Sequence, residues 1–477
     1  MSQDCRHCLL KGEFMTKVHF MGIGGSGLAP IAILAKKMGY DVTGCDISNQ
    51  TAYASSLRDN GIDIIVGHDE KHVDNCDILA VTPALFDYNP DHPELLKAKE
   101  KGILMTWQQF SGEYLQKDKK VIAICGTHGK STTTSLVGEV LEDAGEDPIV
   151  EAGTIIKKWG AGYRYGSSDY FVIEADEFNN NFHHYHPYIT IINNIEMDHP
   201  EFFKDLNEVL DSFKKFVMNI HDGGHLIVNY DSENVVKLVS EMQSYLDAHH
   251  ITVHSYAFNN QDAKYVASID KYHSDSTDFT VNNETHLSVS LIGKFNVENA
   301  MGVYALAQIL NIDDFTLNKG LMNFTGIGRR LEVKGIFDNV TIYDDYAHHP
   351  SAVRNVLQTL KETFPQKKVL AIFEPHQFSR LRMFKEEFAH GFDLADYFIM
   401  TKTFEGREAH KHLEPVKVEE LQKLCHKEIH YIEDFDEIVR EVSKDPYAYD
   451  IIVVFGAGYS YQLTNKLVDY YKGITHE

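Results

Sequence analysis

The sequence has no apolar run long enough to cross a membrane. A membrane-spanning helix needs about 18 or more consecutive apolar residues, and no stretch of the chain reaches that length. The N-terminal stretch contains Asp4, Arg6 and Lys11, which is unlike the apolar core of a secretory signal peptide. We therefore expect no membrane span and a cytoplasmic location.

Cysteine is scarce, with six among 477 residues. This low count excludes the class of small secreted domains that disulfides hold together. Cys45 and Cys125 end apolar runs, and we expect both to be reduced core residues. No second cysteine pair stands near Cys5 and Cys8, so residues 1–16 are predicted to be a disordered leader, with metal binding as the minor alternative.

Basic side chains are also few, with 45 lysines and arginines against 70 acids and a formal net charge of −25. A protein that binds nucleic acid needs a basic face for the phosphate backbone, so nucleic acid is not expected as a partner. Anionic ligands are instead expected to be bound by local glycine loops and metal ions. The length suggests three domains, and a hydrophobic fraction of 43% allows each a sizeable core.

A glycine-rich turn between a buried strand and a helix is the most specific local pattern. Residues 121–125 form an apolar run, and a helical pattern begins near Thr132. Backbone N–H groups of such a loop point at an anion, and the helix N-terminus adds partial positive charge. Lys130 can reach the β- and γ-phosphates of a nucleotide, and the Ser131 hydroxyl is placed to hold Mg²⁺. The predicted loop comprises Gly126, Thr127, His128, Gly129, Lys130, Ser131 and Thr132.

The spacing of this loop departs from the full Walker A pattern. That pattern would put its first glycine at position 124, where Ile124 stands, so the loop is shorter than a standard P-loop. The alternative is a glycine turn followed by a polar helix start. Gly-Lys-Ser directly after a buried strand favours the phosphate site.

A second glycine turn lies near the start of the chain. Residues 17–24 are predicted to form a strand, 28–38 a helix, and 41–46 a second strand that ends in Asp46. This order is typical of a Rossmann unit, in which the turn holds a diphosphate and the acid a ribose hydroxyl. A turn that serves only helix packing is the alternative, and the loop does not decide between NAD and a nucleotide sugar. The turn contains Gly22, Gly24, Gly25, Ser26 and Gly27.

Acidic residues follow the predicted strands 170–174 and 189–195. Glu174 ends the first, and His199 follows the second. Ligands of parallel sheets bind at the carboxyl ends of strands, so both side chains should converge with the phosphate loop. Carboxylates suit Mg²⁺, whereas His199 would bind phosphate or polarise water instead. Glu174 as the cap of a following helix is the alternative.

Two asparagines on a predicted helix are followed along the chain by a predicted linker that contains two arginines. Asn296 and Asn299 share one face of a predicted helix, where amides can bind an adenine edge; an N-capping Asn296 is the alternative. Residues 326–330 are predicted to be a flexible joint. Beyond it, further strands at 340–343, 369–373, 397–400 and 451–455 end in polar residues.

These motifs together resemble the Mur ligase family, ATP-dependent amide-forming enzymes of peptidoglycan synthesis. The resemblance runs from Val18 to about Leu467. It is carried by motifs at residues 22–27, 126–133, 174–177, 194–199, 296–299, 328–330, 344–350 and 375–380.

The resemblance implies an α/β protein of three domains. Residues 17–118 would form an N-terminal Rossmann-like domain that binds UDP-sugar. Residues 119–326 would form a central P-loop-like ATPase domain with a mostly parallel sheet. Residues 327–477 would form a C-terminal Rossmann-like domain that brings the amino acid.

The resemblance also implies roles for individual residues. The expected catalytic residues are Lys130, Glu174, His199, His348 and Arg380. Mg²⁺ would be held by Ser131, Glu174 and His199. ATP would be bound by the loop at 126–132 together with Asn296, Asn299, Arg330 and Asp345. Substrate would be bound by Gly22, Gly24, Gly25, Ser26, Gly27, Asp46, His376 and Tyr346.

The implied reaction joins L-alanine to the carboxylate of UDP-N-acetylmuramate through an acyl phosphate, with ATP as phosphoryl donor and a monomer or homodimer as the working form. A preformed tripeptide in place of alanine is the alternative, and glycine and L-serine also stay open. Three departures from the family pattern are Phe178, Phe295 and Gln377, and the first of these weakens the choice of alanine. Rivals from other classes are an NAD-dependent oxidoreductase built on residues 17–46 and a non-catalytic nucleotide-binding protein.

Overall fold

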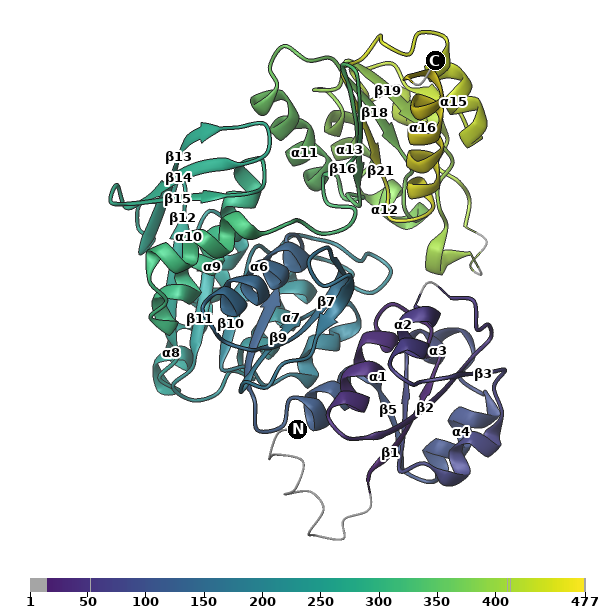
Figure 1. Ribbon diagram of the computed structural model, residues 1–477, viewed down its shortest axis with the longest axis vertical. Coiled ribbons are helices and arrows are strands. Elements are labelled where there is room, and N and C mark those ends of the chain that lie inside the picture. The colour runs from purple at the N-terminus through teal and green to yellow at the C-terminus, as the bar shows by residue number, and fades with distance from the viewer. Residues whose placement is uncertain (1–14, 52, 410, 412, 476–477) are drawn as a thin grey trace.

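The computed structural model describes residues 15–51, 53–409, 411 and 413–475. Three lobes follow one another along the chain, and each is built around its own β-sheet with helices on its faces (Figure 1). The predicted α/β class with three domains is confirmed. The expectation for the leader with Cys5 and Cys8 concerns residues 1–14, which lie outside the described residues.

The N-terminal lobe contains a parallel sheet. Its elements are β1 (Lys17–Met21), α1 (Leu28–Lys37), β2 (Asp41–Asp46), α2 (Ala54–Asp59), β3 (Ile64–Val66), η3 (Glu70–Asn75), β4 (Ile78–Val81), α3 (Ala84–Tyr88), α4 (Pro93–Glu100), β5 (Leu104–Thr106), α5 (Trp107–Phe110) and η4 (Ser111–Leu115). The strand order is β3-β2-β1-β4-β5. Strand β1 ends earlier than predicted, because Gly22 turns the chain with φ +82°.

The central lobe has a larger, mixed sheet. Its elements are β6 (Lys120–Cys125), α6 (Lys130–Asp143), β7 (Ile149–Ile156), β8 (Ala161–Arg164), β9 (Tyr170–Glu174), η5 (Phe178–His184), β10 (Ile189–Ile192), α7 (Leu206–Val217), β11 (His225–Asn229), α8 (Glu233–Ala248), β12 (Thr252–Ala257), β13 (Tyr265–Tyr272), β14 (Thr277–Val281), β15 (Thr285–Val289), α9 (Lys294–Leu310) and α10 (Asp314–Asn323). The order is β15-β14-β13-β12-β11-β10-β6-β9-β7-β8. The middle strands are parallel and both ends of the sheet are antiparallel.

Strand β6 lies between β10 and β9, and this position creates the site. Ile124 pairs with Glu174 on one side, and Cys125 pairs with Ile192 on the other. The loops that follow the three strands therefore leave the sheet at the same edge, where parallel sheets bind ligands.

The C-terminal lobe repeats the parallel pattern with one antiparallel edge strand. Its elements are β16 (Glu332–Phe337), β17 (Val340–Asp345), α11 (Pro350–Thr363), β18 (Val369–Phe373), α12 (Phe378–Met383), α13 (Lys385–Gly391), β19 (Tyr397–Met400), η6 (Gly406–Glu408), α14 (Val418–Gln422), β20 (His430–Tyr431), α15 (Phe435–Ser443), β21 (Ile451–Phe455) and α16 (Ser460–Thr475). The order is β16-β17-β21-β18-β19-β20. Among the described residues, no helix is both long and apolar enough to span a bilayer.

Helix α6 carries a buried carboxyl group that gives the fold a pH dependence. Neither oxygen of Glu139 has a hydrogen-bond partner among the described residues, and Lys158 Nζ is 3.9 Å away. Burial raises the pKa of Glu139 to about 7. The folded state therefore holds a proton that the unfolded chain has released, and stability falls as the pH rises from about 4.5 through 7.

Glu139→Gln is expected to melt a few degrees above the unchanged protein at pH 8 and to show no such gain at pH 5, because glutamine needs no proton. Thermal denaturation at both pH values measures the difference. Glu142→Gln is the matched control, since the pKa of Glu142 is lowered, despite partial burial, by hydrogen bonds from Lys158 and Trp159. A Glu139→Gln gain that is equal at both pH values would contradict the argument.

Candidate active site

The turn after β6 has the shape of an anion-binding loop. Gly126 and Gly129 adopt φ values of +131° and +81°. A Cβ at Gly129 would lie 2.2 Å from Asn299 Oδ1, and one at Gly126 would lie 2.9 Å from Asn194 O. Helix α6 begins directly after the turn, at Lys130, with its free N–H groups facing the loop. Both glycines are therefore required by conformation and by close packing.

Lys130 is largely buried at this turn, with 13% of its side chain exposed, and it lies beside an acid. Its ammonium donates to Gly126 O at 2.7 Å and to Glu177 Oε2 at 2.8 Å. Burial would lower the pKa of Lys130, but the Glu177 and Asp176 carboxylates raise it above its ordinary value. The side chain is thus a fixed positive charge beside the loop. Glu177, at the end of the acidic motif 174–177, is a further residue at this site for which no role was predicted.

Ser131 and Glu174 lie together on the other side of the loop. The Ser131 hydroxyl donates to Glu174 Oε1 at 3.1 Å, and Gly153 N donates to Glu174 Oε2 at 2.7 Å. A hydroxyl and a carboxylate beside a phosphate loop are oxygen donors of the kind that Mg²⁺ prefers. These residues fit the predicted metal site.

His199 lies among acids, in a backbone conformation with φ +53°. Its Nε2 is 3.9 Å from Glu177 Oε1, and its Nδ1 is 3.4 Å from Glu201 Oε1. Burial would lower the pKa of His199, but Asp198 and Glu201 hold it above its ordinary value. Asp176, Glu177 and His199 bring their ligand atoms within 4.8 Å of one another, so His199 belongs to a second acidic group next to Lys130.

Arg380 on α12 connects the C-terminal lobe to this group. Its Nε and Nη2 donate to Asp198 Oδ1 at 2.9 and 2.7 Å, and its side chain is 1% exposed. Its Nη1 is 2.9 Å from His376 Nδ1 and donates to Gln377 Oε1 at 3.0 Å. The ring of His376 lies 5.2 Å from that of His348. The structure thus gathers three predicted residues of the C-terminal lobe around one buried ion pair.

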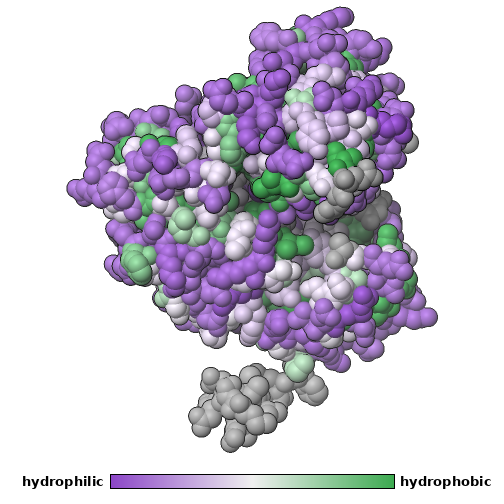
Figure 2. Space-filling model, turned by 45° about the horizontal axis from the view of Figure 1, so that its top comes forward, coloured by the Kyte–Doolittle hydropathy of each residue, from purple (hydrophilic) through white to green (hydrophobic). Residues whose placement is uncertain are grey.

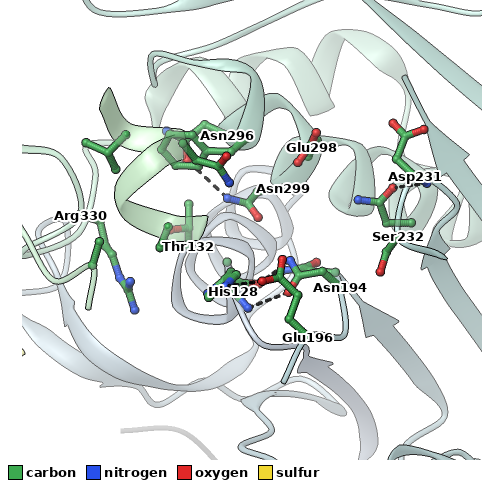
Figure 3. A pocket seen from close by; sticks show the side chains of 18 of the residues that line it. His128, Thr132, Asn194, Glu196, Asp231, Ser232, Asn296, Glu298, Asn299 and Arg330 are labelled. Carbon is green, nitrogen blue, oxygen red and sulfur yellow. Dashed lines mark hydrogen bonds and ion pairs between the residues drawn. The ribbon is translucent and has the colours of Figure 1, made fainter. Parts of the chain in front are cut away.

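A cavity of about 360 Å³ lies between the central and C-terminal lobes. Figure 3 shows His128 and Thr132 of the phosphate loop at its lower side, with Arg330 and Asp231 on opposite sides. Figure 2 shows a mainly hydrophilic surface with hydrophobic side chains gathered where the lobes meet. The predicted ATP contacts that line this cavity are His128, Gly129, Thr132, Asn296, Asn299, Arg330 and Asp345.

Asn296 and Asn299 are almost fully buried at the cavity wall. Asn296 Nδ2 donates to Ile292 O at 2.8 Å, and Asn299 Nδ2 is 3.4 Å from Asn296 Oδ1. Helix α9 begins at Lys294 with Gly293 as its N-cap, so the alternative of an N-capping Asn296 is wrong. The two amides instead fix each other beside the phosphate loop.

The joint between the lobes positions Arg330 and Asp345. The Arg330 guanidinium lies over the Tyr346 ring, 5.1 Å from its centroid. Asp345 accepts hydrogen bonds from the backbone of Leu331 and Ala347. Burial raises the pKa of Asp345, while Arg330 opposes that shift. The Tyr346 ring thus supports the guanidinium of Arg330, which lines the cavity.

A second contact between the lobes involves Ser351, Glu196 and His349, for which the sequence predicted no role. Ser351 Oγ, on α11, donates to Glu196 Oε2 at 2.8 Å and lies 2.9 Å from His128 Nε2. His349 Nε2 is 3.2 Å from Met197 O. Burial would raise the pKa of Glu196, but His128 brings it down to about 2. No local sequence signal pairs residues so distant along the chain.

The N-terminal glycine turn is also tightly packed. Gly24 N donates to Asp46 Oδ2 at 2.9 Å, and a Cβ at Gly24 would lie 2.5 Å from Thr51. A Cβ at Gly27 would lie 2.8 Å from the Trp107 ring. Asp46, predicted to bind a ribose, also organises the turn. The other residues predicted there, Gly22, Gly25 and Ser26, complete the turn before α1.

The three departures from the family pattern lie beside residues of the candidate site or line its cavity. The Phe178 ring lies 4.9 Å from the His199 ring. Phe295 lines the cavity and packs against the core of the C-terminal lobe. Gln377 adopts φ +67° and accepts the hydrogen bond from Arg380.

The chain matches three family models in succession: "Mur ligase family, catalytic domain" over residues 17–117, "Mur ligase middle domain" over 124–307, and "Mur ligase, glutamate ligase domain" over 329–458. It is 37% identical over 454 residues to the UDP-N-acetylmuramate–L-alanine ligase of Caldicellulosiruptor bescii, covering 93% of this chain and 96% of the relative.

Two solved structures are similar over almost the whole chain. The UDP-N-acetylmuramate–alanine ligase MurC of Thermotoga maritima has a TM-score of 0.76 at 27% identity, covering 96% of this chain and 99% of that one. A murein peptide ligase of Psychrobacter arcticus has a TM-score of 0.68 at 23% identity, covering 96% and 98%, and shows the shared fold. The chain belongs to the Mur ligase family.

Proposed function

We propose that this chain joins L-alanine to the lactyl carboxylate of UDP-N-acetylmuramate, with conversion of ATP to ADP and phosphate. The observation that carries the proposal is the 37% identity, over nearly the full length, to a relative named for that reaction. The arrangement of Lys130, Ser131 and Glu174 around a phosphate-type loop supports ATP as the phosphoryl donor. A cytoplasmic location and a monomer or homodimer complete the proposal.

We assign one ligand to each of the three domains. We assign UDP-sugar binding to residues 17–118, with Gly22, Gly24, Gly25, Ser26, Gly27 and Asp46 at the diphosphate and ribose. We assign ATP to residues 119–326 and its adenine to Asn296 and Asn299. Residues 327–477 bring the amino acid, with His348, His376 and Arg380 nearest the reacting carboxylate.

The chemistry needs a better leaving group than a carboxylate offers. The substrate carboxylate attacks the γ-phosphorus, ADP leaves, and an acyl phosphate forms. The neutral amine of L-alanine then attacks the acyl carbon, phosphate leaves, and the amine proton passes to solvent or a nearby base. Lys130 offsets charge on the transferred phosphoryl group, and the contact between the lobes keeps water from the acyl phosphate.

Mg²⁺ is the metal that this donor set suits. Ser131 and Glu174 would hold it. His199 lies in the neighbouring group with Asp176 and Glu177. When bound, the ion would supply Lewis-acid stabilisation of phosphate oxygens.

Phosphate release tests the proposal. ATP and UDP-N-acetylmuramate are supplied with L-alanine, glycine, L-serine or the tripeptide in turn, and L-alanine is expected to give the highest kcat/KM. Omission of the amino substrate is the control for uncoupled hydrolysis. Turnover with the tripeptide alone would establish the alternative function, which the aromatic Phe178 beside His199 favours. Hydride transfer without any ATP turnover would instead show that the protein is an oxidoreductase.

A further inference from the structure

A buried group of metal-ligand side chains lies in the N-terminal lobe, apart from the candidate active site. It consists of His19 on β1, Cys45 on β2, His72 on η3 and Glu94 on α4. One ligand atom from each lies within 4.8 Å of every other. His19 is 2% exposed, and Cys45 and Glu94 are fully buried. Four elements therefore direct nitrogen, sulfur and oxygen donors at one point in the interior.

The distances within this group are those of a tetrahedral metal site. Glu94 Oε1 is 3.5 Å from His19 Nε2, 3.5 Å from His72 Nδ1 and 3.5 Å from Cys45 Sγ. Zinc bonds of about 2.0–2.3 Å in tetrahedral geometry place neighbouring donors about 3.3–3.6 Å apart. The three distances from Glu94 Oε1 to the other donor atoms therefore match those between neighbouring ligands of a zinc ion.

The two histidine nitrogens that face Glu94 have no hydrogen-bond partner of their own among the residues that the structure describes. Neither His19 Nε2 nor His72 Nδ1 forms a hydrogen bond within the described part of the chain. Glu94 pairs with no lysine or arginine among the described residues, although its side chain is fully buried. The Glu94 carboxylate accepts long hydrogen bonds from Cys45 Sγ, at 3.5 and 3.8 Å. Ring nitrogens without a hydrogen bond and a buried carboxylate without a lysine or arginine partner are costly in an apolar interior, and a cation between them would reduce both costs.

Neighbouring groups hold two of the ligands in a binding orientation. His19 Nδ1 lies 2.8 Å from Thr43 Oγ1, so an Nδ1–H that donates there leaves the Nε2 lone pair facing Glu94. His68 Nδ1 lies 3.0 Å from Cys45 Sγ and can donate to a thiolate. Metal-binding histidines are generally fixed in this way through their second nitrogen.

We propose that His19, Cys45, His72 and Glu94 bind one structural zinc ion. On binding, the Cys45 thiol releases its proton, and the thiolate and carboxylate balance the two positive charges of the ion. The two neutral imidazoles complete a closed coordination shell, as in structural rather than catalytic zinc sites. Sulfur and imidazole donors favour zinc over Mg²⁺ or Ca²⁺.

The site would stabilise the glycine turn above it. Cys45 O accepts hydrogen bonds from Gly22 N at 2.8 Å and from Ile23 N at 3.1 Å. A metal bond at the Cys45 side chain fixes the strand end on which this turn rests. It also links η3 and α4 to the sheet.

Metal content and cobalt spectra test the proposal. Protein prepared with zinc, without a histidine tag, is expected to retain about one zinc per chain at this site after gel filtration. Cobalt exchanged into the protein should give a near-ultraviolet thiolate-to-cobalt band and the visible bands of tetrahedral coordination. Within the described residues, the other three groups of possible ligands contain no cysteine. Cys5 and Cys8 lie outside the described residues, so all spectra are recorded on protein that also carries Cys5→Ser and Cys8→Ser, in which the thiolate band reports this site.

Cys45→Ser should abolish the thiolate band, and His72→Ala should lower the retained zinc and the melting temperature. His426→Ala, in an exposed group with His390 and Asp393, is the matched control and should change neither. If the unchanged protein shows no thiolate band on cobalt loading, or if folded His72→Ala retains the band and all of its zinc, the proposal is wrong. The unchanged protein and His72→Ala, whose ring is partly exposed, decide the question even if Cys45→Ser fails to fold.

Discussion

Lys130→Ala is expected to lower phosphate release and amide formation by about 1,000-fold or more. The Lys130 ammonium is a largely buried cation at the phosphate loop, and its loss would leave the charge on the transferred phosphoryl group without this protein partner. UDP-N-acetylmuramate should still bind with near-normal affinity, because its proposed site lies in another lobe. Steady-state kinetics and calorimetric titration with the nucleotide sugar measure the two effects separately.

Two controls make this result specific. Lys214→Ala removes a lysine from a partly exposed ion pair with Asp211 and Glu241, and it should leave activity unchanged. Lys130→Ala also leaves Glu177 buried without its partner, so Lys130→Ala with Glu177→Gln separates lost stability from lost chemistry. The double variant should regain melting temperature but not activity. Near-normal amide formation by Lys130→Ala would refute the assignment.

The sequence predicted this part of the molecule well because its signals are local. A buried strand, Gly126, Gly129 and a lysine at the start of α6 lie within a few residues of each other, and the positive φ angles of the two glycines require glycine there. The strand ends that carry Glu174 and His199 could also be placed, because parallel strands deliver their carboxyl ends to one edge. Here periodicity and turn chemistry agree with the tertiary fold.

Side-chain direction could not be predicted in the same way. Glu174 and Glu177 stand in one acidic motif, yet Glu174 contacts Ser131 while Glu177 contacts Lys130. Only the course of the chain after β9 separates the two. The hairpin β7–β8 was also missed, because Glu151 and Gly153 interrupt an apolar pattern that would otherwise have marked a strand.

Contacts between distant segments left no sequence signal at all. Asp198 and Arg380 are separated by 182 positions, and His19, Cys45, His72 and Glu94 follow no metal-binding spacing. Such pairs form because the lobes and the elements within each lobe pack in one arrangement. Their identification needs coordinates.

Arg380→Ala is expected to reduce kcat by about 100-fold or more. The Arg380–Asp198 pair holds the two lobes in contact, and truncating one partner of a buried charge pair weakens such a contact by about 3 kcal/mol, so the assembled site would be populated far less. The side chain holds the C-terminal lobe to Asp198, beside His199 and the proposed reacting carboxylate. Arg382→Ala is the matched control on the same helix and should leave activity unchanged, because Arg382 donates to Glu414 O in an exposed contact. Kinetics at saturating ATP measures both variants.

A double-mutant cycle with Asp198→Asn tells whether Arg380 acts through this ion pair or on the substrate directly. If the pair holds the lobes together, either single variant already breaks the contact, and the double variant should be no slower than the slower single one. Independent, multiplying losses would mean that Arg380 contacts the substrate without help from Asp198. Arg380→Lys sharpens the test: lysine keeps the charge but cannot reach Asp198, His376 and Gln377 at once. A fully active Arg380→Lys would show that the three-way geometry is unnecessary, whereas a large loss would confirm that the fork of the guanidinium, and not its charge alone, sets the arrangement of the two lobes.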